Sequence, residues 1–112
     1  MLSEKLTKLL LAGLSHRKGK GNAITSKKIV EALEAKGITT NGAEIREHIA
    51  ELRKQGHFIC GDNSGYYLAS NEMEGKAQIK SMRSRVFEML KVVSALEESY
   101  NKNFSQSSTL FE

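Results

Sequence analysis

The sequence predicts a mainly helical fold that contains one small β-hairpin, an α+β arrangement. Three observations support this prediction. The chain has no proline, and its apolar residues recur mostly at helical spacing. Two short runs rich in aromatic and β-branched residues flank the glycine-bracketed segment GDNSG. The 112 residues suit one small domain with an appendage, and 39% hydrophobic with 27% charged residues is an ordinary soluble composition.

The first helix is expected over residues 3–14, with Ser3 as its N-cap. Its apolar stripe consists of Leu6, Leu9, Leu10 and Leu14, or Leu11 in part. Residues 15–22, SHRKGKGN, contain two glycines and several basic groups, so we expect this first loop to be flexible and positively charged. The short β-branched run at residues 23–25 predicts one small strand.

A second helix is expected over residues 26–37, where Gly37 suits the C-terminal end. A short turn follows. Asn41 and Glu44 then form a capping-box-like start for a third helix, which ends at Gly56. The buried stripe of this helix is expected to consist of Ile45, Ile49 and Leu52.

The rest of the chain predicts a hairpin, a long helix and a tail. Residues 57–60 and 66–70 form the expected strands, with residues 61–65 as the loop between them. A long helix then spans residues 71–102, and the polar, serine-rich residues 103–112 are expected to form a flexible tail. We therefore divide the chain into a domain over residues 1–70, this helix and the tail.

The order helix, small strand, helix, turn, helix, hairpin resembles the winged helix-turn-helix family of DNA-binding proteins. The likeness covers residues 3–70, and its local texture is similar to the DNA-binding domain of biotin-ligase repressors. That domain ends its recognition helix with I-x-x-L-R-x-x-G and opens the second wing strand with G-Y-x-L. The matching residues are Ile49, Leu52, Arg53 and Gly56, then Gly65, Tyr66, Tyr67 and Leu68. The resemblance implies that the third helix enters the DNA major groove, while the hairpin, or wing, reaches the backbone or minor groove.

The polar face of the third helix supplies the candidate base-reading residues. They are Ala43, Arg46, Glu47, Ala50, Arg53 and Lys54. Arg46 lies near the helix N-terminus, and a bidentate arginine–guanine pair is the commonest specific contact in the major groove. The small side chains of Ala43 and Ala50 would allow the helix to approach the bases closely, or would contact a thymine methyl group. Thr40 and Asn41, together with the amides at the helix start, are candidates to hold a phosphate.

Basic residues elsewhere supply candidate phosphate contacts. The net charge of the chain is +4, and the first 22 residues account for all of it. The candidates are Arg17, Lys18 and Lys20 in the first loop, and Lys27 and Lys28 at the start of the second helix. The alternative is that these side chains only keep the surface solvated.

Two observations favour a different function. The third helix has three acidic and three basic residues, and the hairpin loop has no Lys or Arg but contains Asp62. A neutral helix beside a wing without basic residues suits an adaptor that binds other proteins without contacting DNA. Protein–protein adaptor therefore remains the alternative to DNA binding.

The long C-terminal helix carries an a/d heptad pattern with steps of three and four. Its members are Ile79, Met82, Val86, Met89, Val93, Leu96 and Tyr100. β-Branched residues at a positions with Met and Leu at d positions favour a two-stranded coil, so the sequence predicts a homodimer. The alternative is that the helix folds back on its own domain, although its length of about 45 Å exceeds what such a domain can cover.

The sequence contains no catalytic set, so we do not expect an enzyme. Its three histidines are scattered, and Cys60 lacks metal-ligand spacing, so no cofactor or metal is expected. The single cysteine suits a reducing cytoplasm, and neither a signal peptide nor a membrane span is expected. The expected function is sequence-specific binding of double-stranded DNA by a dimeric transcriptional regulator or similar DNA-site factor.

Overall fold

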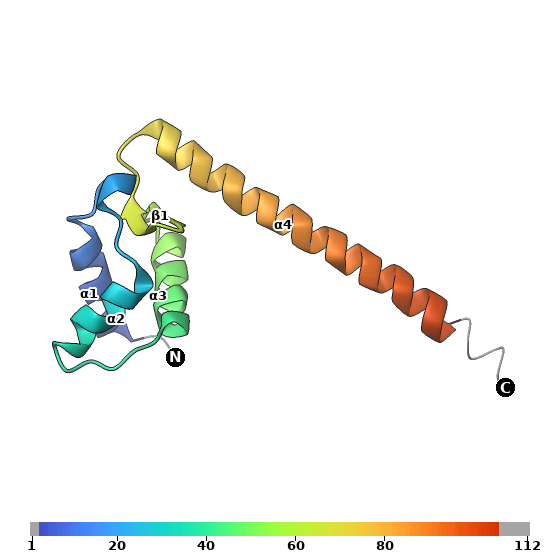
Figure 1. Cartoon of the computed structure of the whole chain (residues 1–112), viewed down its shortest axis with the longest axis horizontal. Helices are drawn as coiled ribbons and strands as arrows, with labels where there is room; N and C mark the ends of the chain where they lie inside the picture. Colours follow the sequence, from blue (N-terminus) through green and yellow to red (C-terminus); the bar gives the residue numbers. More distant parts are fainter. Residues whose placement is uncertain (1–2, 106–112) are drawn as a thin grey trace. The chain divides into compact units, whose positions relative to one another are not determined.

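The computed structural model describes residues 3–105 and confirms a mainly helical fold with one antiparallel hairpin (Figure 1). In chain order the elements are α1 (Glu4–Leu14), a 3-10 turn η1 (Lys20–Asn22), α2 (Ser26–Glu34), α3 (Gly42–Lys54), β1 (Ile59–Asp62), β2 (Gly65–Leu68), α4 (Glu72–Tyr100) and a π-helical turn η2 (Asn101–Ser105). The chain divides into two compact units after Gln78. We call the described residues 3–78 the head and residues 79–105 the distal helix.

Each long helix begins at a side chain that satisfies one of its unpaired N–H groups, and for α1 and α3 this is the residue that the sequence predicts. The caps are Ser3 for α1, Thr25 for α2, Asn41 for α3 and Asn71 for α4. In α3 the capping is reciprocal. The Glu44 N–H donates to Asn41 Oδ1 at 2.9 Å, and Asn41 Nδ2 donates to Glu44 Oε1 at 3.0 Å.

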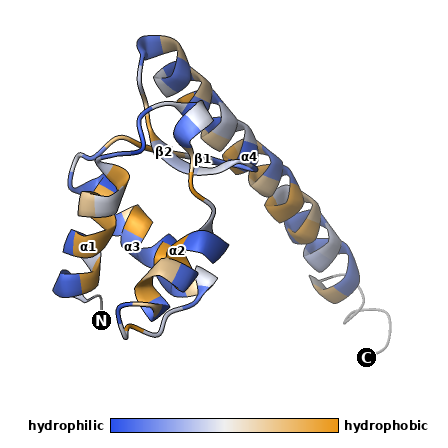
Figure 2. Cartoon of the chain, turned by 60° about the vertical axis from the view of Figure 1, so that its left-hand side comes forward, coloured by the Kyte–Doolittle hydropathy of each residue, from blue (hydrophilic) through white to orange (hydrophobic). Residues whose placement is uncertain are grey.

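The core of the head lies between α1, α2, α3 and β1. In Figure 2 the apolar segments of the three helices are turned toward one another. Nine buried residues form one cluster: Leu6, Leu10, Leu14, Ile29, Leu33, Ile45, Ile49, Leu52 and Ile59. The predicted stripe of α3 is confirmed, and the predicted stripe of α1 is confirmed except for Leu9, which packs at the edge of the cluster.

The hairpin strands extend further into GDNSG than the sequence predicts. Asp62 pairs with Gly65, so only residues 63–64 form the loop. Two local features tighten this turn. The Ser64 N–H donates to Asp62 Oδ1 at 2.7 Å, and Gly65 takes a φ of +118°, which other residues rarely adopt. A Cβ at Gly65 would also collide with the carbonyl of Ile24.

The expectation that the first loop is flexible is wrong, because its backbone is hydrogen-bonded to β2. The Gly19 N–H donates to the Leu68 carbonyl at 2.8 Å, and the Leu68 N–H donates to the Arg17 carbonyl at 2.7 Å. Ile24 and Tyr66 exchange two further bonds at 2.9 and 2.8 Å. The small strand predicted at residues 23–25 is reduced to this single bridge at Ile24. The loop therefore lines the free edge of the hairpin.

The first two turns of α4 are bonded to the head. Glu74 accepts hydrogen bonds from the Ser70 N–H at 2.8 Å and the Lys20 N–H at 3.0 Å. Gln78 Oε1 accepts from the Gly61 N–H at 3.0 Å. These contacts make the start of α4 part of the head. Of the predicted tail, residues 103–105 continue as a π-helical turn, and residues 106–112 lie outside the described residues.

Candidate nucleic-acid interface

The outward face of α3 presents five of its six candidate residues. Ala43, Arg46, Glu47, Ala50 and Lys54 are exposed. The 3.6-residue period of the helix places them opposite the stripe that packs in the core. A helix with one face in the core and the other in solvent is able to lie in a groove of a partner.

The N-terminal ends of α2 and α3 lie next to each other. Gly42 marks this point. A Cβ placed on it would lie 3.6 Å from Nη1 of Arg46 and 3.9 Å from Oγ of Ser26. Lys27 and Lys28 follow Ser26 directly and are exposed. We call Lys27, Lys28 and Arg46 the basic cluster.

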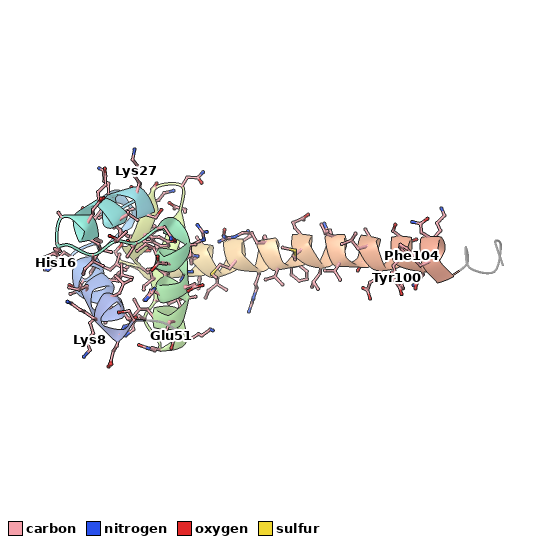
Figure 3. The ribbon with its side chains drawn as sticks, turned by 90° about the horizontal axis from the view of Figure 1, so that it is seen from below. Lys8, His16, Lys27, Glu51, Tyr100 and Phe104 are labelled. Atoms are coloured by element: carbon pink, nitrogen blue, oxygen red, sulfur yellow. The ribbon has the colours of Figure 1, made fainter. Side chains whose placement is uncertain are left out.

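The charges of the basic cluster have no partner of opposite charge within residues 3–105. None of its three side chains forms a salt bridge or a hydrogen bond there, whereas the nearby Glu44 and Arg53 are hydrogen-bonded. Figure 3 shows Lys27 pointing outward from α2, on the side of the head away from Lys8 and Glu51. Three unpaired cations near two helix N-termini form a local positive region, because helix N-termini also carry partial positive charge.

Arg53 differs from its expected placement on the exposed face. Its side chain is half-buried, and its Nε donates to the carbonyl of Ile59 at 2.8 Å. This bond joins the last turn of α3 to the first residue of β1. Arg53 therefore fixes the hairpin against the helix, and the side chain is committed to that contact.

The two candidates at the start of α3 do not offer unused side-chain groups. The amide of Asn41 is engaged with Glu44 on both its oxygen and its nitrogen. The hydroxyl of Thr40 is enclosed and has no partner among the described residues. What this end of α3 offers a ligand is its first backbone N–H groups, at Gly42 and Ala43, which lack intrahelical partners.

The basic residues of the first loop lie beside the hairpin. Lys20 Nζ is 3.5 Å from Asp62 Oδ2, Arg17 Nη1 donates to the Asn22 carbonyl at 3.5 Å, and Lys18 is exposed. Burial alone would raise the pKa of Asp62. The hydrogen bond from the Ser64 N–H and the charge of Lys20 outweigh that effect, so the pKa is lowered. The acidic group of the wing is thus neutralised by a lysine that the sequence places 42 residues earlier.

His48 is a structural residue that the sequence analysis did not single out. It is 3% exposed, and its Nε2 accepts a hydrogen bond from the Ser3 N–H at 3.1 Å. Its Nδ1 must therefore carry the proton that is shared with the Glu44 carbonyl, 2.6 Å away. His48 ties the start of α1 to α3. Its place on the Ile45–Ile49 stripe is a signal that could have identified it as buried.

The remaining reactive groups of the head are buried and serve packing. Cys60 is fully buried, and burial raises the pKa of its thiol. Burial and the nearby Asp62 carboxylate raise the pKa of Tyr67 to about 12, and its hydroxyl donates to Asp62 at 3.4 Å. Across residues 3–105, no three His, Cys, Asp or Glu side chains are placed to hold a metal ion. Within the same range, no helix has the length and apolar character that crossing a membrane requires.

The predicted dimerisation residues form an uncovered apolar face on α4. All seven are exposed, from 39% at Met82 to 65% at Met89. Phe87, Leu90 and Val92 are also more than half exposed. A single chain therefore leaves the apolar side chains of the distal helix in water.

Comparisons with family models, with curated proteins and with solved structures find no significant match to this chain.

Proposed function

We propose that this protein binds double-stranded DNA in the cytoplasm as a winged-helix homodimer, acting as a transcriptional regulator or a similar DNA-site factor. The observation that supports this most is the unpaired basic cluster where the N-terminal ends of α2 and α3 adjoin. In helix-turn-helix proteins the first residues of the recognition helix contact base edges. The cluster lies at the corresponding end of α3.

Each exposed residue of this surface has a role in the proposal. Arg46 reads a guanine through two hydrogen bonds, while Lys27 and Lys28 contact phosphates on either side. Ala43 and Ala50 have no long side chain and allow α3 to approach the base edges. Lys54 and the first-loop residues Arg17 and Lys18 contact more distant phosphates. Glu47 discriminates between bases by accepting from cytosine.

The test is the affinity for random duplex DNA across a series of salt concentrations. For wild type we expect the logarithm of the binding constant to fall linearly with the logarithm of salt concentration. Lys27→Ala removes one phosphate contact and flattens that slope by about 0.9. Arg46→Ala is expected to weaken binding to a preferred site by about 1–3 kcal/mol and to relax sequence preference.

Lys8→Ala is the matched control. Lys8 is 78% exposed on α1 and lies 3.9 Å from Glu4, so its loss changes the same formal charge away from the basic cluster. It should leave the salt slope and the sequence preference unchanged. An absence of wild-type binding at low salt, or equal slopes for all three variants, would rule the proposal out.

A protein–protein adaptor is the second candidate function. It is favoured by the charge of α3, where three acidic and three basic residues cancel, and by the absence of Lys and Arg from the hairpin. An adaptor would retain its fold and its oligomeric state but show no salt-dependent affinity for DNA. The salt series therefore separates the two candidates.

A further inference from the structure

We infer that the uncovered apolar face of α4 pairs with a second copy of this chain in an antiparallel orientation, with the two-fold axis at the level of Lys91. The inference deepens the homodimer proposed above and rests on it. It specifies which residues meet across the interface. The basis is the order of charged and apolar residues along the exposed flanks of the helix.

The flanks of the distal helix change character along its length. Arg83 and Arg85 lie toward its start, and Glu97 lies toward its end. Between them lie the exposed apolar residues outside the a/d positions, Phe87, Leu90 and Val92. The order is therefore basic, apolar, acidic. Such a sequence is complementary to itself only when the second copy runs in the opposite direction.

In the antiparallel pair centred on Lys91, a residue of one copy and a residue of the other share a core layer when their residue numbers sum to 182. Each copy then contributes the same three pairings: Met82 with Tyr100, Val86 with Leu96, and Met89 with Val93. Two-fold symmetry repeats them and gives six consecutive a–d layers. All six residues are exposed in the single chain. Only Ile79 lies outside these layers, next to the head.

The flanking pairs distinguish the two orientations. In the antiparallel pair, Arg83 faces Glu97 twice, and the two copies of Leu90 and of Val92 face each other at the centre. In a parallel pair, g residues face the e residues five positions later. Arg85 would then face Leu90, and Val92 would face Glu97. The parallel pair thus places apolar side chains against charges, whereas the antiparallel pair places Arg83 against Glu97 and apolar residues against each other, with Arg85 facing polar Ser99.

The orientation determines where the heads are attached. Each head continues into the N-terminal end of α4, so an antiparallel pair attaches the two heads at opposite ends. The two copies of Ile79 are separated by 24 residue levels, or about 36 Å at 1.5 Å per residue. A parallel pair would attach both heads at the same end.

Disulfide trapping in a Cys60→Ala background tests the orientation. We introduce Val86→Cys in one full-length chain and Leu96→Cys in another. In the antiparallel register these residues share a core layer, but two copies of Val86 lie ten levels apart, about 15 Å, beyond the reach of a disulfide. We expect neither variant to cross-link alone under mild oxidation, and we expect the 1:1 mixture to give the mixed disulfide dimer.

The outcomes separate this inference from the dimer itself. If each variant cross-links with itself and the mixture gives no mixed disulfide, the helices are parallel, and the inference is overturned while the dimer stands. If the Cys60→Ala parent is monomeric by light scattering, both are overturned.

A charge exchange gives a second readout without cysteines. Arg83→Glu should raise the dimer dissociation constant about tenfold, because two attractions become two repulsions. The double variant Arg83→Glu with Glu97→Arg should restore it. A parallel dimer predicts no restoration, because Arg83 and Glu97 do not face each other there.

Discussion

The head and the distal helix carry the same kind of amphipathic pattern, but only the head buries it. In α3 the stripe residues Ile45 and Leu52 are 0% and 1% exposed. In α4 the stripe residues Val86 and Met89 are 59% and 65% exposed. Since both stripes follow helical spacing, the difference lies in the presence of a covering surface. The stripe of α3 is covered within the head, whereas the stripe of the distal helix is left exposed by the described chain.

The largest expected effect follows from placing charges on the uncovered stripe. Val86→Asp together with Val93→Asp would bury four carboxylates in the dimer. We therefore expect the dimer dissociation constant to rise at least about a thousandfold. The head should unfold at the same denaturant concentration as in a wild-type monomer. Light scattering gives the mass, and Ser84→Asp, on the polar side of the helix, is the control. A wild-type chain that is already monomeric would contradict the prediction.

The next effect compares the loss in the free energy of unfolding when a stripe residue of the head and one of the distal helix are each replaced by alanine. Ile45→Ala removes a fully buried side chain, so we expect a loss of about 3 kcal/mol in the free energy of unfolding. Met89→Ala, compared in the monomeric Val86→Asp, Val93→Asp chain, should cost less than about 0.5 kcal/mol. Both are measured by urea unfolding monitored by circular dichroism. Equal losses would mean that α4 packs on its own head.

Most of the head could be predicted because its signals are local in the sequence. Ser3, Thr25, Asn41 and Asn71 each precede a helix and cap it, and the stripes of α1 and α3 have the spacing that burial requires. These features depend on residues three or four apart. The order of the elements follows from them.

The features that sequence analysis missed depend on partners outside the helix or loop concerned, most of them backbone N–H and C=O groups. The first loop looks flexible from its glycines and charges, but its order comes from hydrogen bonds between Gly19 or Arg17 and Leu68. The role of Arg53 likewise depends on the carbonyl of Ile59, and that of Lys20 on Asp62. A hydrogen bond to a main-chain group leaves no recognisable pattern of side chains in the sequence. The sequence could therefore assign the candidate interface to α3. It could not tell which of the candidate side chains are bonded within the head and which are unpaired.

A smaller effect tests how the hairpin holds the head together. Gly65→Ala places a Cβ at a φ of +118° and against the Ile24 carbonyl, so we expect a loss of about 2 kcal/mol or more. Gly37→Ala introduces the unfavourable φ of +81° with no atom nearby and should cost about 1 kcal/mol. Gly21→Ala, with open space and an ordinary φ, should be close to neutral. If Gly65→Ala and Gly37→Ala cost the same, the contact with Ile24 adds nothing to the backbone strain.

The smallest expected effect concerns Glu74, at the boundary between the two regions. Hydrogen bonds from the Ser70 and Lys20 N–H groups hold its pKa below the ordinary value of 4.5. A lowered pKa in the folded state means that the ionised carboxylate stabilises the fold above the unfolded pKa. That contribution is lost as the pH falls through the folded value. Glu74→Gln should therefore melt slightly below wild type at pH 7, and the two should converge at pH 3.

The position of Glu74 makes this difference local. Its two oxygens hold the first loop and the start of α4 together, so Glu74→Gln should increase amide exchange at Gly75 and Gln78 more than at Ile45. Glu72→Gln is the control, since Glu72 lies in the same turn but, among residues 3–105, pairs only with exposed Lys76 at 3.1 Å. Faster exchange confined to residues 72–78 would show that these turns belong to the head because of Glu74. Unchanged exchange would mean that Gln78, through the Gly61 N–H, fixes this boundary instead.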